Sequence, residues 1–259
     1  MSHGLHGITC EYHEIGYYSG FLLRRSISII IPAYNEEKRL PDTLAVLQAY
    51  LAATPWEFTE IVVVDDGSRD GTAEVARAAG VGVLRNPGNR GKGYSVRHGM
   101  LKARGDWLLF SDADLSTPIE ELEKLWAAIE RERAQAAIGS RGLDRSLIGV
   151  RQPLFRDVGG RFFNLVIRLL TGLPFHDTQC GFKLFESAAA REIFRRQRVE
   201  RFGFDVEVLF IAQRLGYRIL EVPVRWNDVA GTKVKMLGAL AAFLDPAKVR
   251  WNGLTGKYR

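Results

Sequence analysis

Short apolar runs alternate with amphipathic stretches along the first half of the chain. The runs are rich in β-branched and large apolar residues and occupy positions 27–31, 61–64, 81–84 and 107–110. Between the first two runs, apolar residues recur at helical spacing, at Leu40, Leu44, Leu47 and Leu51. This alternation of strands and helices predicts an α/β fold built on a mostly parallel, doubly wound sheet with helices on both faces.

Several helix boundaries can be predicted in this half. We expect a helix from about residue 72 to 79 that ends at Gly80 in a left-handed conformation. Residues 117–120, Thr-Pro-Ile-Glu, predict a capping box with proline at the first position of the following helix. Residues 86–93 form a glycine-rich connection into a helix that reaches about Lys102.

After residue 133 the pattern is less regular. We expect a strand at 136–140, a polar loop at 142–156, helices at 162–175, 185–194 and 206–215, and a last strand at 219–226. Pro223 lies inside this last strand and cannot donate a ladder hydrogen bond, so the strand is expected at an edge of the sheet.

Three of the first strands end in polar or acidic loops, at residues 32–36, 65–68 and 111–114. The carboxyl ends of parallel strands are where open α/β sheets bind ligands. Asp112 and Asp114 are separated by one residue, and in a tight turn both carboxylates can face one pocket, where they suit Mg²⁺ or Mn²⁺. A single Asp-x-Asp is also common in turns and helix caps, so the prediction depends on the three loops occurring together.

Composition limits the class of protein. The 259 residues suit one large domain, with 25% charged and 46% hydrophobic residues, and the net charge is +6. The basic residues are dispersed and not interleaved with aromatics, so we expect a phosphorylated ligand or an anionic membrane surface and no nucleic acid. Two cysteines, Cys10 and Cys180, support neither a disulfide framework nor a structural zinc site and fit a reducing cytoplasm.

The three strand-end loops together resemble the nucleotide-sugar half of family 2 glycosyltransferases, which have the GT-A fold. The resemblance implies a nucleotide-sugar donor and a divalent cation, Mg²⁺ or Mn²⁺. It implies metal ligation by Asp112 and Asp114. The residues that it implies for nucleotide binding are Pro32, Tyr34, Glu36, Asp65, Asp66, Lys92, Asp112 and Ala113.

The second half is similar to polyprenyl-phosphate hexose synthases, and to dolichyl-phosphate glucose synthases in particular. The similarity lies in Asp-Thr-Gln-Cys-Gly-Phe-Lys at 177–183 and in Arg-Trp-Asn at 225–227 and again at 250–252. It implies an inverting transfer of glucose from UDP-glucose to a polyprenyl phosphate. The implied catalytic residues are Asp114, Arg141, Arg156 and Lys233.

Three alternatives stay open at this point. The donor could be GDP-mannose, because the Asp-Ala-Asp loop is shared with mannose synthases. The acceptor could be a sugar or small-molecule hydroxyl, which needs a carboxylate base, and the candidates are Asp144, Asp177 and Asp205. A protein that only binds nucleotide sugars is a third alternative, against which the complete set of motifs argues.

We expect residues 1–25 to be a poorly specified leader, 26–232 to be the glycosyltransferase domain and 233–259 to be a basic amphipathic segment. That last segment could lie in a lipid headgroup layer or pack on the core. No stretch approaches the roughly 20 apolar residues that span a bilayer. We therefore expect a cytoplasmic protein that binds peripherally to the inner face of the membrane.

Overall fold

The computed structural model describes residues 26–150, 154–229 and 236–259, with the side chains of 154–157, 161–162 and 236–243 left out of the description. The expected leader at 1–25 lies outside these residues. The described chain forms one seven-stranded sheet in the order β3-β2-β1-β4-β6-β5-β7. The strands are β1 (Ser26–Ala33), β2 (Phe58–Asp65), β3 (Gly82–Arg85), β4 (Trp107–Ser111), β5 (Ala136–Ser140), β6 (Phe182–Glu186) and β7 (Ile219–Pro223).

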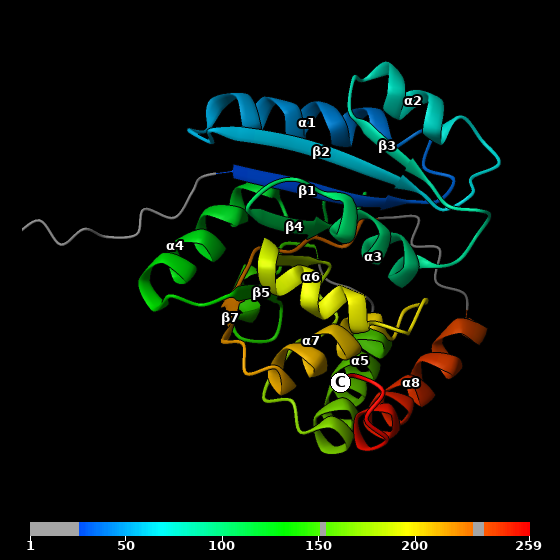
Figure 1. Ribbon diagram of the computed structural model, residues 1–259, viewed down its shortest axis with the longest axis vertical. Coiled ribbons are helices and arrows are strands. Elements are labelled where there is room, and N and C mark those ends of the chain that lie inside the picture. The colour runs from blue at the N-terminus through cyan, green and yellow to red at the C-terminus, as the bar shows by residue number, and fades with distance from the viewer. Residues whose placement is uncertain (1–25, 151–153, 230–235) are drawn as a thin grey trace, which may run out of the picture.

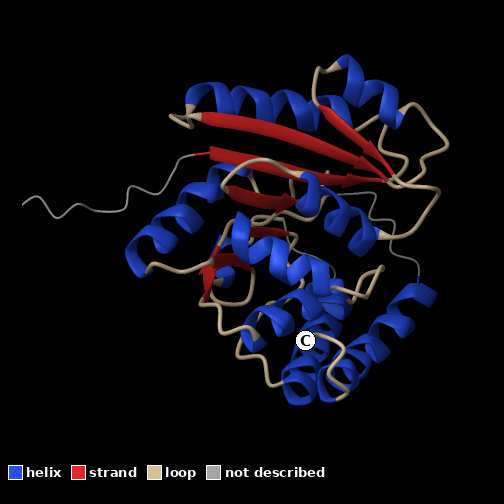
Figure 2. Ribbon diagram, in the orientation of Figure 1, coloured by secondary structure: helices blue, strands red, loops and turns tan. Residues whose placement is uncertain are grey.

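Helices cover both faces of the sheet (Figures 1 and 2). They are α1 (Leu40–Ala53), α2 (Thr72–Ala78), α3 (Lys92–Lys102), α4 (Leu122–Glu132), α5 (Leu154–Thr171), α6 (Ser187–Arg196), α7 (Phe204–Arg214) and α8 (Met236–Leu254). Successive residues of a strand point to opposite faces, so Ile29 and Ile31 pack under α1 and α4 while Ile30 packs under α3. The doubly wound sheet expected from the alternating pattern is therefore confirmed.

One strand runs against the others. The pairs β1–β2, β1–β4, β2–β3 and β5–β7 are parallel, whereas β6 lies antiparallel between β4 and β5. The expected helix at 185–194 is thus wrong at its start, because residues 182–186 are β6 and α6 begins at Ser187. Phe182 and Leu184 pack on one face of the sheet and Phe185 on the other, which is strand periodicity in a run too short to separate from the helix after it.

Other boundaries also differ from expectation. The helix expected at 162–175 is α5, which begins at Leu154 inside the expected polar loop. No capping box forms at 117–120, since a 3₁₀ turn, Ile119–Glu121, follows Pro118 without a side-chain cap and α4 begins at Leu122. Gly80 has the expected left-handed conformation, with φ of 72°, and β7 has the expected place at the edge of the sheet.

The end of the chain is held to the core by a buried carboxylate. Tyr258, beyond α8, donates a 2.6 Å hydrogen bond to Glu207 Oε1 on α7, and Glu207 Oε2 accepts from the backbone N–H groups of Arg198 and Val199. Burial raises the pKa of Glu207, while these hydrogen bonds favour its ionised form. The contact ties α8 to the segment between α6 and α7.

Tyr258→Phe is expected to lower the free energy of unfolding by about 1–3 kcal/mol, because Glu207 loses its hydroxyl donor in a site closed to water. Urea denaturation measures the loss. Tyr217→Phe is the matched control, because in the described part of the chain its hydroxyl has no hydrogen bond. Equal stability of the two variants would contradict the assignment.

Candidate functional site

The loops after β1 and β2 are joined to each other by hydrogen bonds. The N–H of Asn35 donates to Ser68 Oγ, Asn35 Oδ1 accepts from the N–H of Arg69, and the N–H of Glu36 donates to Thr72 Oγ1. Asn35 adopts a left-handed φ of 54°, which asparagine tolerates better than most residues. The predicted residues Pro32, Tyr34 and Glu36 therefore lie at the carboxyl edge of the sheet, where these hydrogen bonds hold the loop in place. Each of them is partly exposed.

The two acids after β2 have different surroundings. Asp66 accepts from Asn86 Nδ2 and from the N–H groups of Arg90 and Gly91, so both of its oxygens order the glycine-rich loop. Asp65 is fully buried, and its Oδ1 accepts from the N–H of Ser68. Among the described residues, Asp65 Oδ2 has no hydrogen bond, and it forms an ion pair with Arg85, whose Nε lies 3.2 Å away. Arg85 thus supplies the counter-charge of the buried Asp65, which the motif resemblance assigns to the nucleotide.

Asp112, at the end of β4, is paired with Lys92. The Lys92 Nζ lies 2.6 Å from Asp112 Oδ1 and sits 5.2 Å above the centre of the Phe110 ring. Asp112 Oδ2 lies against Gly181, where an added Cβ would come within 2.0 Å of it. Burial alone would lower the pKa of Lys92, but the charges of Asp112 and Asp205 raise it, so the lysine stays charged.

Asp114 lies on the same turn as Asp112. Its Oδ1 accepts from the N–H of Ser116, and the carbonyl of Ala113 between the two acids accepts from Thr43 Oγ1 at 2.6 Å. The described residues hold no cluster of three or more His, Cys, Asp or Glu side chains suited to a metal ion. Asp112 and Asp114 supply two carboxylates, the oxygen ligands that Mg²⁺ accepts together with water and phosphate, and Lys92 and the N–H of Ser116 each occupy one of their oxygens.

A second ion pair lies beside this turn and was not assigned from the sequence. Lys183 on β6 donates 2.5 Å hydrogen bonds to Asp205 Oδ1 and to the carbonyl of Cys180, and both side chains are buried. Burial raises the pKa of Asp205, against the effect of Lys183 and Lys92. In the sequence, the only indication of this ion pair is the lysine within residues 177–183. A pattern of apolar and polar positions does not reveal that its partner lies 22 residues further along the chain.

Arg141, after β5, is engaged by Asp177. Its Nε and Nη2 donate to the two oxygens of Asp177 at 2.6 and 2.9 Å, and its guanidinium lies 5.4 Å from the centre of the Trp226 ring. Burial alone would raise the pKa of Asp177, but Arg141 lowers it to about 2. The structure therefore brings Arg141 to the same edge of the sheet as Asp112. There its guanidinium is bound by both oxygens of Asp177 and lies over the ring of Trp226.

Two of the predicted catalytic residues are not placed. Lys233 lies outside the described residues, and Arg156 falls in α5 at a position whose side chain is not described. Asp144, a candidate base, caps a turn instead, since its Oδ1 accepts from the N–H and the hydroxyl of Ser146.

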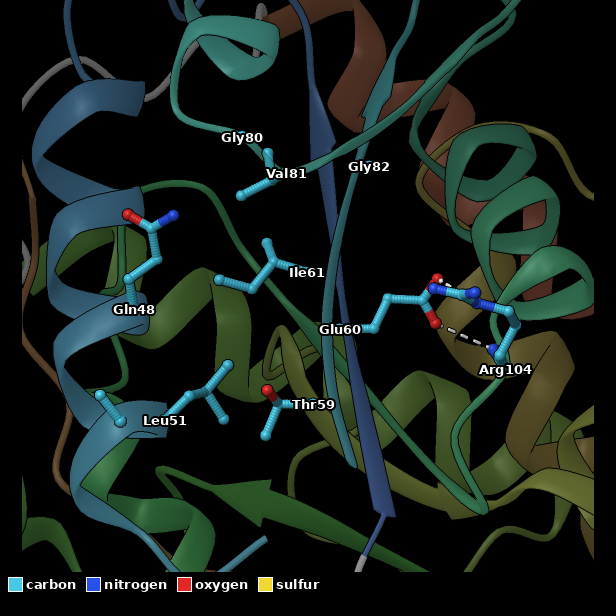
Figure 3. A pocket seen from close by; sticks show the side chains of 10 residues that line it. Gln48, Leu51, Thr59, Glu60, Ile61, Gly80, Val81, Gly82 and Arg104 are labelled. Carbon is cyan, nitrogen blue, oxygen red and sulfur yellow. Dashed lines mark hydrogen bonds and ion pairs between the residues drawn. The ribbon is translucent and has the colours of Figure 1, made fainter. Parts of the chain in front are cut away.

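A cavity of about 430 Å³ lies away from these residues, between α1 and the start of β2 (Figure 3). Its lining includes Leu51 from α1, Thr59 and Ile61 from β2, and Glu60 where it pairs with Arg104. The acidic loops follow the opposite, carboxyl ends of the strands, so this cavity is not part of the site.

Comparison with known proteins places this arrangement in a family. Residues 28–194 match the family model for glycosyl transferase family 2, which covers the three strand-end loops, Lys92, Arg141 and β6. The chain belongs to glycosyltransferase family 2. Its relatives include the dolichyl-phosphate beta-glucosyltransferase of Drosophila melanogaster, which is 42% identical over 80% of this chain and 69% of that relative. The Homo sapiens enzyme of the same name is 36% identical over 91% of this chain and 78% of the relative.

Solved structures of related enzymes share the GT-A fold. Mannosyl-3-phosphoglycerate synthase from Rubrobacter xylanophilus superposes with a TM-score of 0.66 at 18% identity, over 90% of this chain and 75% of that one. Glucosyl-3-phosphoglycerate synthase from Mycobacterium tuberculosis, in complex with Mn²⁺, UDP-glucose and phosphoglyceric acid, gives 0.61 at 20% identity, over 86% and 80%. The family 2 assignment and the GT-A fold expected from the motifs are confirmed.

Asp177→Asn is expected to lower the free energy of unfolding by about 3 kcal/mol at neutral pH, because Arg141 loses its counter-charge. A lowered pKa means that the unfolded chain binds this proton more tightly than the folded one. The stabilisation is therefore complete above the unfolded pKa of about 4 and is lost as the pH falls toward about 2.

Urea denaturation at neutral pH and near pH 3 tests this pH dependence. The stability gap between wild type and Asp177→Asn should narrow in acid. Asp42→Asn, at an exposed position of α1, is the control for loss of a surface carboxylate. A gap that stays constant between the two pH values would refute the depressed pKa.

Proposed function

We propose that this protein is a metal-dependent, inverting hexosyltransferase that moves glucose from UDP-glucose to a polyprenyl phosphate of the dolichyl type. The observation that carries the proposal is the similarity to relatives named dolichyl-phosphate beta-glucosyltransferase, at 32–42% identity in fly, human and yeast, over 80% or more of this chain. It extends beyond the nucleotide-sugar half into the residues expected to receive the acceptor. UDP-glucose with Mn²⁺ in a neighbour of the same fold supports the choice of donor and cofactor.

The residues at the end of β4 suit departure of a nucleoside diphosphate. Asp112 and Asp114 would hold Mg²⁺ or Mn²⁺, which acts as a Lewis acid on the leaving diphosphate when bound. Lys92 stands at the first residue of α3, so that its ammonium and the helix N-terminus both favour a phosphate group there. Asp65, the last residue of β2, is assigned to the nucleoside by the motif resemblance.

The surroundings of three carboxylates favour a phosphate acceptor over a hydroxyl. A hydroxyl must lose a proton to a base during attack, whereas a phosphate monoester is already mostly ionised near neutral pH. Asp177 has a pKa of about 2 and is clamped by Arg141, which makes it a weak base. The pKa of Asp144 is lowered by its hydrogen bonds from Ser146.

The third carboxylate, Asp205, is buried and bound to Lys183. Asp177 and Asp205 are thus buried and bound to cations, and the exposed Asp144, with its lowered pKa, is a weak base. Arg141, with Arg156 and Lys233 from the motif resemblance, is proposed to attract the anionic acceptor.

Contact with a membrane is proposed to involve α5 and α8, which pack against each other. Large apolar side chains on them are 50–76% exposed, namely Leu165, Leu169, Leu244, Trp251 and Leu254. Exposed basic residues stand beside them at Arg168, Lys248 and Arg250. Apolar and basic side chains combined in this way suit an anionic lipid surface. In the described part of the chain no helix combines the length and apolarity needed to cross a bilayer.

Asp114→Ala is expected to reduce turnover by about 100-fold or more, because the cation loses one of its two carboxylates. The assay measures UDP release from UDP-glucose with Mg²⁺ or Mn²⁺ and a short polyprenyl phosphate. Asp42→Ala, on the exposed face of α1, should keep wild-type turnover. Release that needs no lipid would favour a hydroxyl acceptor, and release from GDP-mannose alone would change the donor.

Leu169→Ser combined with Trp251→Ser is expected to reduce binding to phosphatidylcholine vesicles that contain phosphatidylglycerol, measured by co-sedimentation. Val46→Ser is the matched control, because Val46 is 46% exposed on α1, far from α5 and α8 (Figure 1). Equal binding by both variants would argue against this surface.

A further inference from the structure

We propose that Lys92 couples cation binding to nucleotide binding, by competing with the divalent cation for Asp112 until a diphosphate gives its ammonium another partner. The inference rests on the proposed function, because it takes these two ligands as given. It adds a thermodynamic role for Lys92 beyond contact with the donor: the lysine opposes the cation alone and favours the cation together with the nucleotide.

The geometry of Asp112 makes the competition direct. Its carboxylate lies against Gly181, where an added Cβ would come within 2.0 Å of Oδ2, and its Oδ1 lies 2.6 Å from Lys92 Nζ. The backbone N–H of Asp112 donates to the carbonyl of Gly181, which holds the residue in place. The ammonium therefore occupies a carboxylate oxygen that a divalent cation bound to Asp112 would also use, and two cations at one carboxylate repel each other.

The backbone of Lys92 cannot move aside to relieve this repulsion. Gly91 has a φ of 107°, and an added Cβ on it would lie 2.6 Å from the carbonyl of Glu200. An added Cβ on Gly93 would lie 2.6 Å from the carbonyl of Val199. The two glycines are thus closed in by the segment between α6 and α7, and the response to a cation falls to the flexible Lys92 side chain.

The side chain has an alternative position when a diphosphate is present. Lys92 is the first residue of α3 and so stands at the positive end of that helix dipole, which favours a phosphate group. A diphosphate bound there would draw the ammonium from Asp112 and leave Oδ1 to the cation. By linkage, nucleotide then tightens cation binding and cation tightens nucleotide binding by the same factor, commonly about 5- to 150-fold.

Lys92→Met tests the coupling through binding alone, without turnover. Free Mn²⁺ is measured by electron paramagnetic resonance with and without UDP, and UDP binding by calorimetry with and without Mn²⁺. The variant should bind Mn²⁺ alone about 5-fold or more tighter than wild type, bind UDP more weakly, and lose most of the coupling factor. Lys92→Arg, which keeps the charge, should retain weak binding of Mn²⁺ alone.

Lys124→Met is the matched control, because Lys124 Nζ also lies 2.6 Å from a carboxylate oxygen, that of Glu121, and it should leave both affinities unchanged. Binding of Mn²⁺ alone that is unchanged or weaker in Lys92→Met would overturn the inference while leaving the proposed function intact. A wild-type protein that binds neither UDP nor Mn²⁺ would instead overturn the proposed function. Thermal melting of each variant verifies that the fold is retained.

Discussion

The site depends on one strand, β6, that runs antiparallel to its neighbours. β6 pairs antiparallel with both β4 and β5, so its first residue, Phe182, lies opposite Ser111 at the end of β4. The segment that leads into β6 therefore arrives at the same edge as the acidic loops, and it brings Gly181 against Asp112 and Asp177 against Arg141. A parallel strand in that position would have delivered the same residues to the opposite edge.

Charges at this edge are arranged in pairs that limit what each group can do. Lys92 with Asp112 is partly exposed and can exchange partners, whereas Lys183 with Asp205 is sealed from solvent. Arg141 stays bidentate to a carboxylate of low pKa, which removes that carboxylate as a base and keeps the guanidinium oriented. Such a site is suited to bringing two anionic phosphates together and poorly suited to removing a proton from a hydroxyl.

The sequence predicted the parts of this fold that local pattern determines. Up to about residue 133 the strands and helices lie where the spacing of apolar residues predicts them, and the acidic loops follow the strands. Gly80 ends its helix as expected. The antiparallel β6 was missed because five residues that run directly into a helix carry too little periodicity to be distinguished from it. The pairing of Arg141 with Asp177 joins residues 36 apart, and no spacing rule encodes a contact made by sheet topology.

The buried Lys183 explains how so short a strand finds its register. Along β6, Lys183 and Phe185 share one face with Phe110, whereas Phe182 and Leu184 pack on the other. A slip by one residue would exchange the faces and place the ammonium among apolar side chains, away from Asp205. A buried ion pair contributes little net stability, but leaving one partner unpaired is strongly unfavourable. The pair is thus better explained by its effect on the register of β6 than by net stabilisation. The register that it favours holds Gly181 against Asp112.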